Sequence, residues 1–280
     1  MSLSSGLETG KVHFKDKIRQ KRVNLAHPSS RILLGICTLN GLRIDCTLET
    51  VSSATPTIKL NPGSDVSRPI DALCSWLKLS PNEDEVKCGR HDFGRLSCRQ
   101  QATLKVVFQR PFSRSPNVTA WFHKFDVSGL AIGAVAVATR DVTSKGFTIQ
   151  VETSAPAGSN LVITAFGVPV YGEFANTATC DVGVSWIAFP HSREDVTCGT
   201  YNVTSITSAG QTVGHVSFAD ACFNSPPQLF LAIAATHLTQ RIGSHELRAT
   251  KVTAEGFDWQ VETRDGSAQS LTAAYVAFPT

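Results

Sequence analysis

The residues best suited to acid–base or metal chemistry are eight histidines and 23 carboxylates, and they form no recognised motif. No nucleophile, zinc or phosphate-loop pattern surrounds any of the histidines. Pairs of carboxylates could serve a glycosidase, but this chemistry needs a set separation that a linear sequence does not reveal. We therefore predict a protein that is not an enzyme, with no metal and no cofactor. The histidines are His13, His27, His91, His123, His191, His215, His237 and His245.

The eight cysteines also lack a metal-binding pattern, because no Cys-x-x-Cys pair or Cys/His cluster at zinc spacing occurs. An even number is compatible with disulfides, but a chain of this length does not need them as a scaffold. We predict mostly reduced thiols that pack as small apolar side chains.

Five residues are candidates for binding a ligand. Arg43 stands in an apolar strand pattern, where its guanidinium offers a rigid set of donors. An exposed strand arginine with no ligand explains Arg43 equally well. Arg264 and Asp265 precede a glycine and could instead be ordinary turn residues. Arg241 is a weaker candidate, and Trp121 could contact a ligand or a neighbouring subunit.

The chain contains an internal repeat with an offset of 110 residues. The segment from Phe108 to Thr153 matches the segment from Phe218 to Thr263 at many positions, including Val-Thr-x-x-Gly-Phe and Gln-Val-Glu-Thr. The preceding pairs Cys88-Gly89 and Cys198-Gly199 keep the same offset. A constant offset over so many positions indicates duplicated structural units.

A third, weaker copy occupies the N-terminal part, where Ser75-Trp76 matches Ser185-Trp186. Because both tryptophans hold the same place in a repeated apolar strand, we predict that they lie in a core. The predicted units are residues 1–82, 83–193 and 194–280. The middle unit carries 21 extra residues, and the stretch 158–176 is the predicted insertion.

The patterned segments alternate apolar and polar residues with a period of two, and no long helical period competes with them. Val135 and Val137 alternate with Ala136 and Ala138, and Asn40-Gly41 is a strong hairpin signal. We predict an all-β chain of tandem antiparallel β-sandwiches, with about six strands each.

At these residues the sequence resembles the H-type lectin family, of the kind found in snail agglutinins and in the C-terminal domain of discoidins. The match rests on Ser225-Pro226-Pro227, on Val252 to Phe257 and on Ser185 to Ala188. The resemblance implies six-stranded sandwiches that assemble in threes. It also implies binding of galactose-type sugars, often N-acetylgalactosamine, in clefts between neighbours. Three tandem copies would then form an intramolecular pseudo-trimer, although a homo-oligomer is an alternative.

The sequence departs from the family where the resemblance places the sugar. The family has a tryptophan at positions that hold Gly63, Ser154 and Arg264 here. The family arginine that binds the sugar is retained only as Arg43, because Ala134 and Ser244 take its place in the other copies. The expected site residues are therefore Arg43, Arg241, Arg264, Asp265 and Trp121. The alternative is an interaction or scaffold protein that has lost sugar binding.

Composition narrows the range of partners. The net charge is +3, and the basic cluster at residues 15–22 lacks the aromatic residues typical of nucleic-acid binding. No signal-peptide pattern and no apolar stretch long enough to span a bilayer occur. We expect glycans or glycoproteins as partners, without nucleic acid or membrane insertion. We also expect a cytoplasmic location or secretion by a non-classical route.

Overall fold

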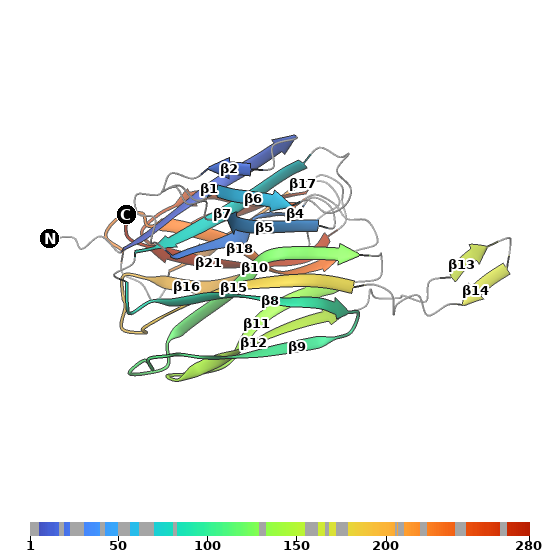
Figure 1. Cartoon of the computed structure of the whole chain (residues 1–280). Coiled ribbons are helices and arrows are strands. Elements are labelled where there is room, and N and C mark those ends of the chain that lie inside the picture. Colours follow the sequence, from blue (N-terminus) through green and yellow to red (C-terminus); the bar gives the residue numbers. More distant parts are fainter. Residues whose placement is uncertain are drawn as a thin grey trace.

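The computed structural model is an all-β protein in which strands of neighbouring repeats pair with one another (Figure 1). No helix occurs in the part of the chain that it describes, and hence none that could span a membrane. The described residues are 6–16, 20–22, 31–39, 43–49, 57–61, 70–80, 83–128, 133–154, 162–165, 168–171, 179–204, 206, 210–218, 223–238, 245–263 and 268–280.

The first repeat packs a sheet ordered β1-β7-β3 near strands ordered β2-β6-β5. All pairs within these sheets are antiparallel, as the alternating sequence pattern predicts. The strands are β1 (Leu7–Asp16), β2 (Gln20–Arg22), β3 (Arg31–Ile36), β4 (Thr38–Leu39), β5 (Arg43–Glu49), β6 (Thr57–Asn61) and β7 (Ile70–Leu79).

The second repeat has the same arrangement, with strands ordered β8-β15-β10 and β9-β12-β11. Its strands are β8 (Lys87–Ser97), β9 (Gln101–Val107), β10 (Asn117–Ser128), β11 (Ala134–Thr143), β12 (Gly146–Ser154) and β15 (Thr179–Phe189). A separate hairpin, β13 (Val162–Ala165) and β14 (Val168–Tyr171), lies within the stretch that we interpret as the insertion. This hairpin projects away from the sandwiches (Figure 1).

The third repeat again orders its strands β16-β21-β18 and β17-β20-β19. Its strands are β16 (Thr197–Thr204), β17 (Gly210–Ser217), β18 (Gln228–Leu238), β19 (His245–Val252), β20 (Gly256–Thr263) and β21 (Ala268–Phe278). The prediction of tandem six-stranded antiparallel sandwiches is therefore confirmed. The sequence boundaries that we assigned to the three units stay predictions.

A glycine beneath an aromatic ring recurs in all three repeats and explains part of the repeated sequence. Gly89 pairs with Trp186, and a Cβ at Gly89 would lie 2.8 Å from the indole ring. The close approach of the ring therefore requires glycine. Trp186 and Trp76 are both buried, as predicted from their repeated position. The equivalent pairs are Gly10 with Trp76 and Gly199 with Tyr275.

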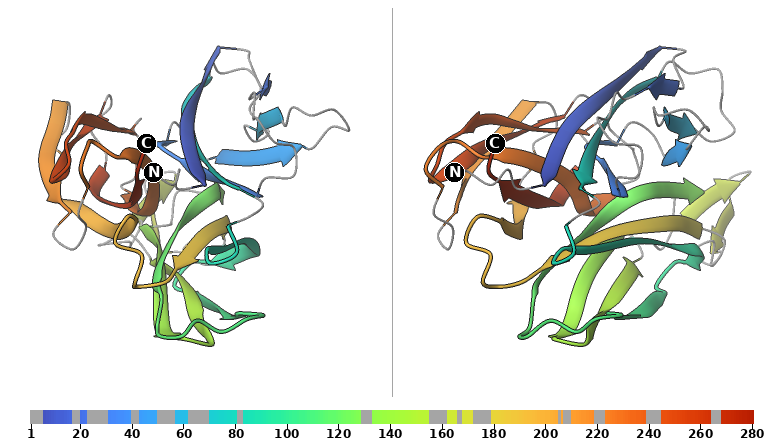
Figure 2. Two further views of the ribbon diagram at one scale, coloured as in Figure 1. Left: turned by 90° about the vertical axis from the view of Figure 1, so that its left-hand side faces the viewer. Right: turned by 60° about the vertical axis from the view of Figure 1, so that its left-hand side comes forward.

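The three repeats form a closed ring, and Figure 2 shows them arranged around a common axis. In each repeat the equivalent strand (β10, β18, or β3 with its continuation β4) extends beyond its own sandwich and pairs with a neighbouring repeat. The end of β10 pairs with β5, the end of β18 pairs with β11, and β4 pairs with β19. The ring is thus an intramolecular pseudo-trimer, held by antiparallel backbone pairing as well as by side chains.

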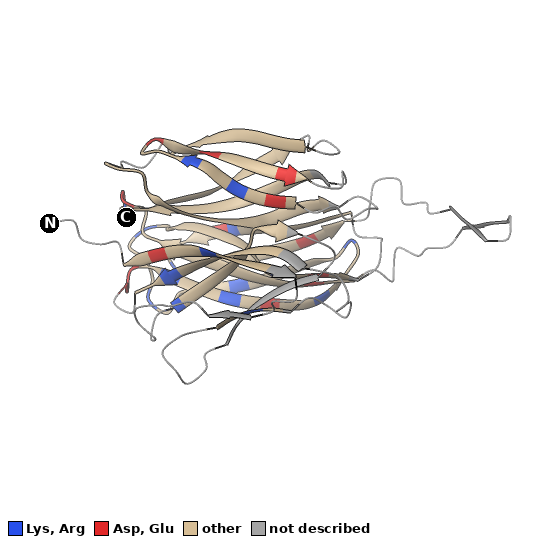
Figure 3. Ribbon diagram, turned by 90° about the horizontal axis from the view of Figure 1, so that it is seen from above, with Lys and Arg blue, Asp and Glu red and all other residues tan. Residues whose placement is uncertain are grey.

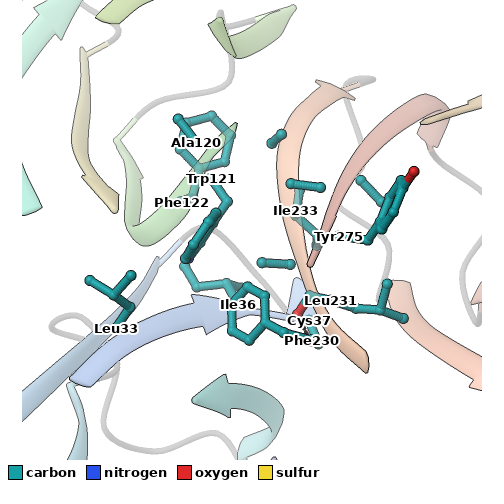
Figure 4. Close-up of a cluster of buried hydrophobic side chains, with 14 of the residues drawn as sticks. Leu33, Ile36, Cys37, Ala120, Trp121, Phe122, Phe230, Leu231, Ile233 and Tyr275 are labelled. Atoms are coloured by element: carbon teal, nitrogen blue, oxygen red, sulfur yellow. Dashed lines mark hydrogen bonds between the residues drawn. The ribbon is translucent and has the colours of Figure 1, made fainter. Parts of the chain in front are cut away.

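Trp121 lies on the ring axis, at a position that has an equivalent in each of the other two repeats. Trp121 on β10 corresponds to Gly35 on β3 and to Ala232 on β18, because each pairs with the same position of its last strand. Trp121 has no exposed surface, and its indole N–H donates a hydrogen bond of 2.8 Å to the Leu34 carbonyl of the first repeat. Its ring lies 4.7 Å from the Phe230 ring of the third repeat (Figure 4). One large and two small residues therefore complement one another at the axis.

Among the cysteines whose side chains the structure describes, five are reduced as predicted and Cys74 is not. Cys74 is disulfide-bonded, whereas Cys37, Cys88, Cys98, Cys180 and Cys198 carry no disulfide. Burial raises the pKa of the Cys37 thiol, and it raises the pKa of Cys198 to about 12. The Cys37 sulfur lies 2.9 Å from the Ser75 hydroxyl and 3.0 Å from the Leu231 carbonyl, so this thiol serves packing between repeats.

Candidate functional site

The three places where neighbouring repeats pair differ sharply in chemistry. We call them the first seam (β5 with β10), the second seam (β11 with β18) and the third seam (β19 with β4). The resemblance in the sequence places ligands between neighbouring units, so each seam is a candidate site. The side chains at the paired positions decide which seam could bind a polar ligand.

The first seam is highly charged. Its register sets Arg43 opposite Asp126 and Asp45 opposite Lys124. The Lys124 ammonium also forms an ion pair of 2.9 Å with Asp181 of the adjacent strand β15. Both partners of this ion pair are about three-quarters buried, so their charges are screened less than those of fully exposed pairs.

The charges continue across the sheet beyond the seam. Asp126 pairs in register with Asp181, and Asp181 pairs with the exposed Arg95 on β8. Along this row of the sheet, two neighbouring aspartates therefore stand between two arginines, and no single sign dominates. Figure 3 shows the same intermixing of basic and acidic residues over the strands of the molecule.

These charged residues were missed in the sequence, although a signal for them exists. In β10, Lys124 and Asp126 alternate with Phe125 and Val127, which are each 1% exposed. This alternation sends one set into the sandwich core and leaves the other on the outer face. A charged outer face is ordinary for a strand, so the pattern alone does not distinguish a site from a solvated surface.

A buried histidine adjoins the first seam. His123 is the bulge residue of β10, where the register with β15 shifts. Its Nδ1 lies 3.1 Å from the Ser185 hydroxyl and its Nε2 lies 3.2 Å from an Asp92 carboxylate oxygen. This set resembles a serine–histidine–aspartate arrangement. Ser185 has no exposed surface, however, so its hydroxyl cannot reach an external substrate.

The contact between Asp92 and His123 should stabilise the fold, and this stabilisation should depend on pH. The hydrogen bond with His123 lowers the pKa of the Asp92 carboxyl. A lowered carboxyl pKa stabilises the fold above the unfolded value of about 3.9, and this stability is lost as pH falls. Asp92→Asn should therefore lower the urea midpoint at neutral pH, and the difference from wild type should shrink as the pH falls below about 3.9. A pH-independent loss in Asp92→Asn would contradict the assignment.

The second seam offers few polar groups, because Ala134 faces His237, while Val135 and Ala136 face Thr236 and Ala235. It is better suited to packing than to binding a hydroxyl-rich ligand.

The third seam contains one carboxylate among its paired positions. The buried Glu246 stands opposite Thr38 and forms an ion pair with Arg248 on its own strand. The neighbouring His245 is also buried, and its Nδ1 lies 3.1 Å from the Thr263 hydroxyl. The third seam is therefore polar, but it has fewer charged residues at its paired positions than the first.

The predicted site residues are placed as follows. Arg43 begins β5 and takes part in the first seam through its backbone. Trp121 lies on the ring axis without exposed surface, so a sugar has no access to its ring there. Its indole contacts Leu34 of the first repeat and Phe230 of the third. The loop residues Arg241, Arg264 and Asp265 lie outside the described residues.

Metal chemistry finds no support in the described part of the chain. Within it, no three histidine, cysteine, aspartate or glutamate side chains gather closely enough to hold a metal ion.

One protein family and two solved structures are similar to parts of this chain. The family profile of the H-type lectin domain matches residues 103–166 and 213–278, which lie in the second and third repeats. Among solved structures, the chain is similar to recombinant discoidin II of Dictyostelium discoideum, with 15% identity and a TM-score of 0.27; 68% of this chain and 82% of that chain are covered. A second structure, wild-type discoidin II, has 14% identity and a TM-score of 0.25, with 68% and 80% covered. No curated protein sequence matches the chain. The second and third repeats thus each match the H-type lectin domain.

Proposed function

We propose that the protein is a non-catalytic lectin that binds a galactose-type or N-acetylgalactosamine-type glycan at the first seam. The observation that carries this proposal is the register of β5 with β10, which sets Arg43 opposite Asp126. Residues directly opposite in an antiparallel pair share a face of the sheet. The proposal therefore rests on an arginine, a lysine and aspartates at paired backbone positions where two lectin-like repeats meet.

The chemistry of this cluster suits a sugar. Arginine donates up to five hydrogen bonds in a fixed geometry, and carboxylates accept hydrogen bonds from hydroxyl groups. Charged groups that already pair with each other, such as Lys124 with Asp181, are held in place before the ligand arrives. Such preorganisation reduces the entropy lost on binding. The paired positions of the second seam hold no arginine, lysine or carboxylate, and those of the third seam hold a single carboxylate, Glu246. We therefore propose one sugar site, at the first seam, rather than three.

A glycan array followed by titration tests the proposal. The wild-type chain should bind arrays that carry terminal galactose or N-acetylgalactosamine. Arg43→Ala should weaken that binding by about tenfold or more, because a hydrogen bond to a charged group contributes about 1.5–3 kcal/mol. The matched control is His237→Ala at the second seam, which should bind normally. Absence of glycan binding by the wild-type chain would refute the proposal, and unchanged affinity in Arg43→Ala would remove the first seam from it.

The alternative function is an interaction or scaffold protein built on lectin-like sandwiches. The observation in its favour is the composition of the second seam, where alanine and valine occupy the positions that pair with Ala235, Thr236 and His237. If the wild-type chain binds no glycan on the array, this alternative becomes the better description of the molecule.

A further inference from the structure

A separate pocket of about 510 Å³ lies at the junction of the first and second repeats, away from the first seam. It is lined by Arg31 at the start of β3 and by residues around the starts and ends of β8 and β9. Trp186 in its wall pairs with Ala120 on β10, whereas the first seam begins at Lys124. The two places are thus separated by roughly 15 Å along β10.

The pocket carries an excess of positive charge. Arg31, Lys87 and Arg110 line it, and Asp84 is the single acidic residue among its lining groups. The two terminal nitrogens of Arg31 donate hydrogen bonds of 3.1 and 2.7 Å to the Val86 and Glu83 carbonyls, which holds the guanidinium in place. These carbonyls use only two of its five N–H groups.

The other two cations are also available to a ligand. The Lys87 ammonium lies 4.8 Å from the centre of the Phe112 ring, and Arg110 is exposed. Neither forms an ion pair with a carboxylate in the described part of the chain. Gln109 adds an amide, and Val107, which is 67% exposed, adds apolar surface. Cations, an amide and apolar surface together are groups that suit an anionic sugar.

The other repeats show that the fold itself does not require these cations. The position of Lys87 is Thr197 in the third repeat, and the position of Arg110 is Asp220 by the 110-residue offset. The position of Arg31 is occupied by Asn117 and Gln228, because all three pair with the same place of the last strand. The positive charge is therefore particular to this pocket.

We infer that this pocket is a second saccharide site, one that binds the carboxylate or sulfate group of an acidic sugar. This inference rests on the proposed lectin function, which is the reason for expecting a saccharide as the ligand. The positive charge of the pocket is the reason for expecting an acidic one. The anionic group contacts Arg110, Lys87 and the remaining donors of Arg31. The sugar ring lies against the exposed side chain of Val107, and its hydroxyls meet Gln109 and Asp84. The volume falls within the range of small-molecule sites.

The test uses the full chain and four probes: saccharides ending in neutral galactose, glucuronate, N-acetylneuraminate or 6-sulfogalactose. The variant Lys87→Thr/Arg110→Asp gives the pocket the residues of the third repeat, which that repeat tolerates. It should lose acidic-saccharide binding by about tenfold or more and keep neutral galactose binding. Arg43→Ala should do the reverse. Arg140→Asp, an exposed change on β11, should alter neither.

Salt provides an independent measurement, because exposed charge contacts are screened. Raising the ionic strength from about 0.05 to 0.5 M should weaken acidic-probe binding far more than neutral-probe binding. The inference is overturned if no acidic probe binds, if the double variant binds acidic probes normally, or if an acidic peptide outcompetes them. Loss of both probe classes in Arg43→Ala would also overturn it, since a single site would explain both. Failure of neutral binding alone would refute only the first-seam proposal.

Discussion

Replacing Trp121 by alanine should lower the free energy of unfolding by about 3–5 kcal/mol, the usual cost of truncating a large buried aromatic side chain. The indole is fully buried between Phe230 of the third repeat and the Leu34 carbonyl of the first. Its removal leaves a cavity where Gly35 and Ala232 are too small to fill the space, because both lie at the equivalent positions. Urea unfolding followed by circular dichroism measures the change.

Trp121→Phe is the matched control, because it keeps an aromatic ring and removes the indole N–H. It should cost less than the alanine variant, with about 1 kcal/mol coming from the lost hydrogen bond. A loss below about 1 kcal/mol in Trp121→Ala would show that the axis contributes little to stability. In that case the backbone pairing at the three seams would have to hold the ring together.

Replacing Gly146 by alanine should cost about 3 kcal/mol, at the upper end of the range for overpacking, because the obstacle is backbone. A Cβ at Gly146 would overlap the Val106 carbonyl oxygen of the neighbouring strand β9. The same overlap occurs between Gly256 and the Val216 carbonyl, so Gly256→Ala should behave alike. These glycines belong to the repeated Val-Thr-x-x-Gly-Phe motif, and the close approach of backbone explains why the motif contains glycine.

Hydrogen exchange distinguishes this effect from a general glycine effect. In Gly146→Ala, the amides of β9 should lose protection, because the strand must move away from β12 to admit the methyl group. Gly94→Ala is the control: Gly94 has a φ of 70° with no atom within 4 Å of an added Cβ. Its cost of about 1 kcal/mol should come from backbone strain alone and leave β9 protected. Unchanged exchange in β9 of Gly146→Ala would contradict the proposed overlap.

Much of the architecture could be predicted from the sequence alone. The constant offset of 110 residues showed the repeat, and the period-two alternation in segments such as residues 134–143 showed antiparallel strands with one buried face. Both signals can be seen in a linear sequence because one is a constant offset and the other is a short period. Each repeat also buries one face of its strands in the same way. The burial of Trp76 and Trp186 followed from their shared place in that pattern.

The tertiary structure alone decided how the repeats meet. Arg43 was singled out from the sequence, but its position opposite Asp126 depends on pairing between strands about 80 residues apart, for which the sequence carries no local signal. For the same reason, the sequence predicted only that Trp121 contacts a ligand or a neighbouring subunit. An alternating pattern shows that one face of β10 is covered, but not that Gly35 and Ala232 of two other repeats leave the space that the indole fills. The alternation of side chains along a strand indicates which residues are buried. It does not indicate which residues cover them, because those residues lie far away in the sequence.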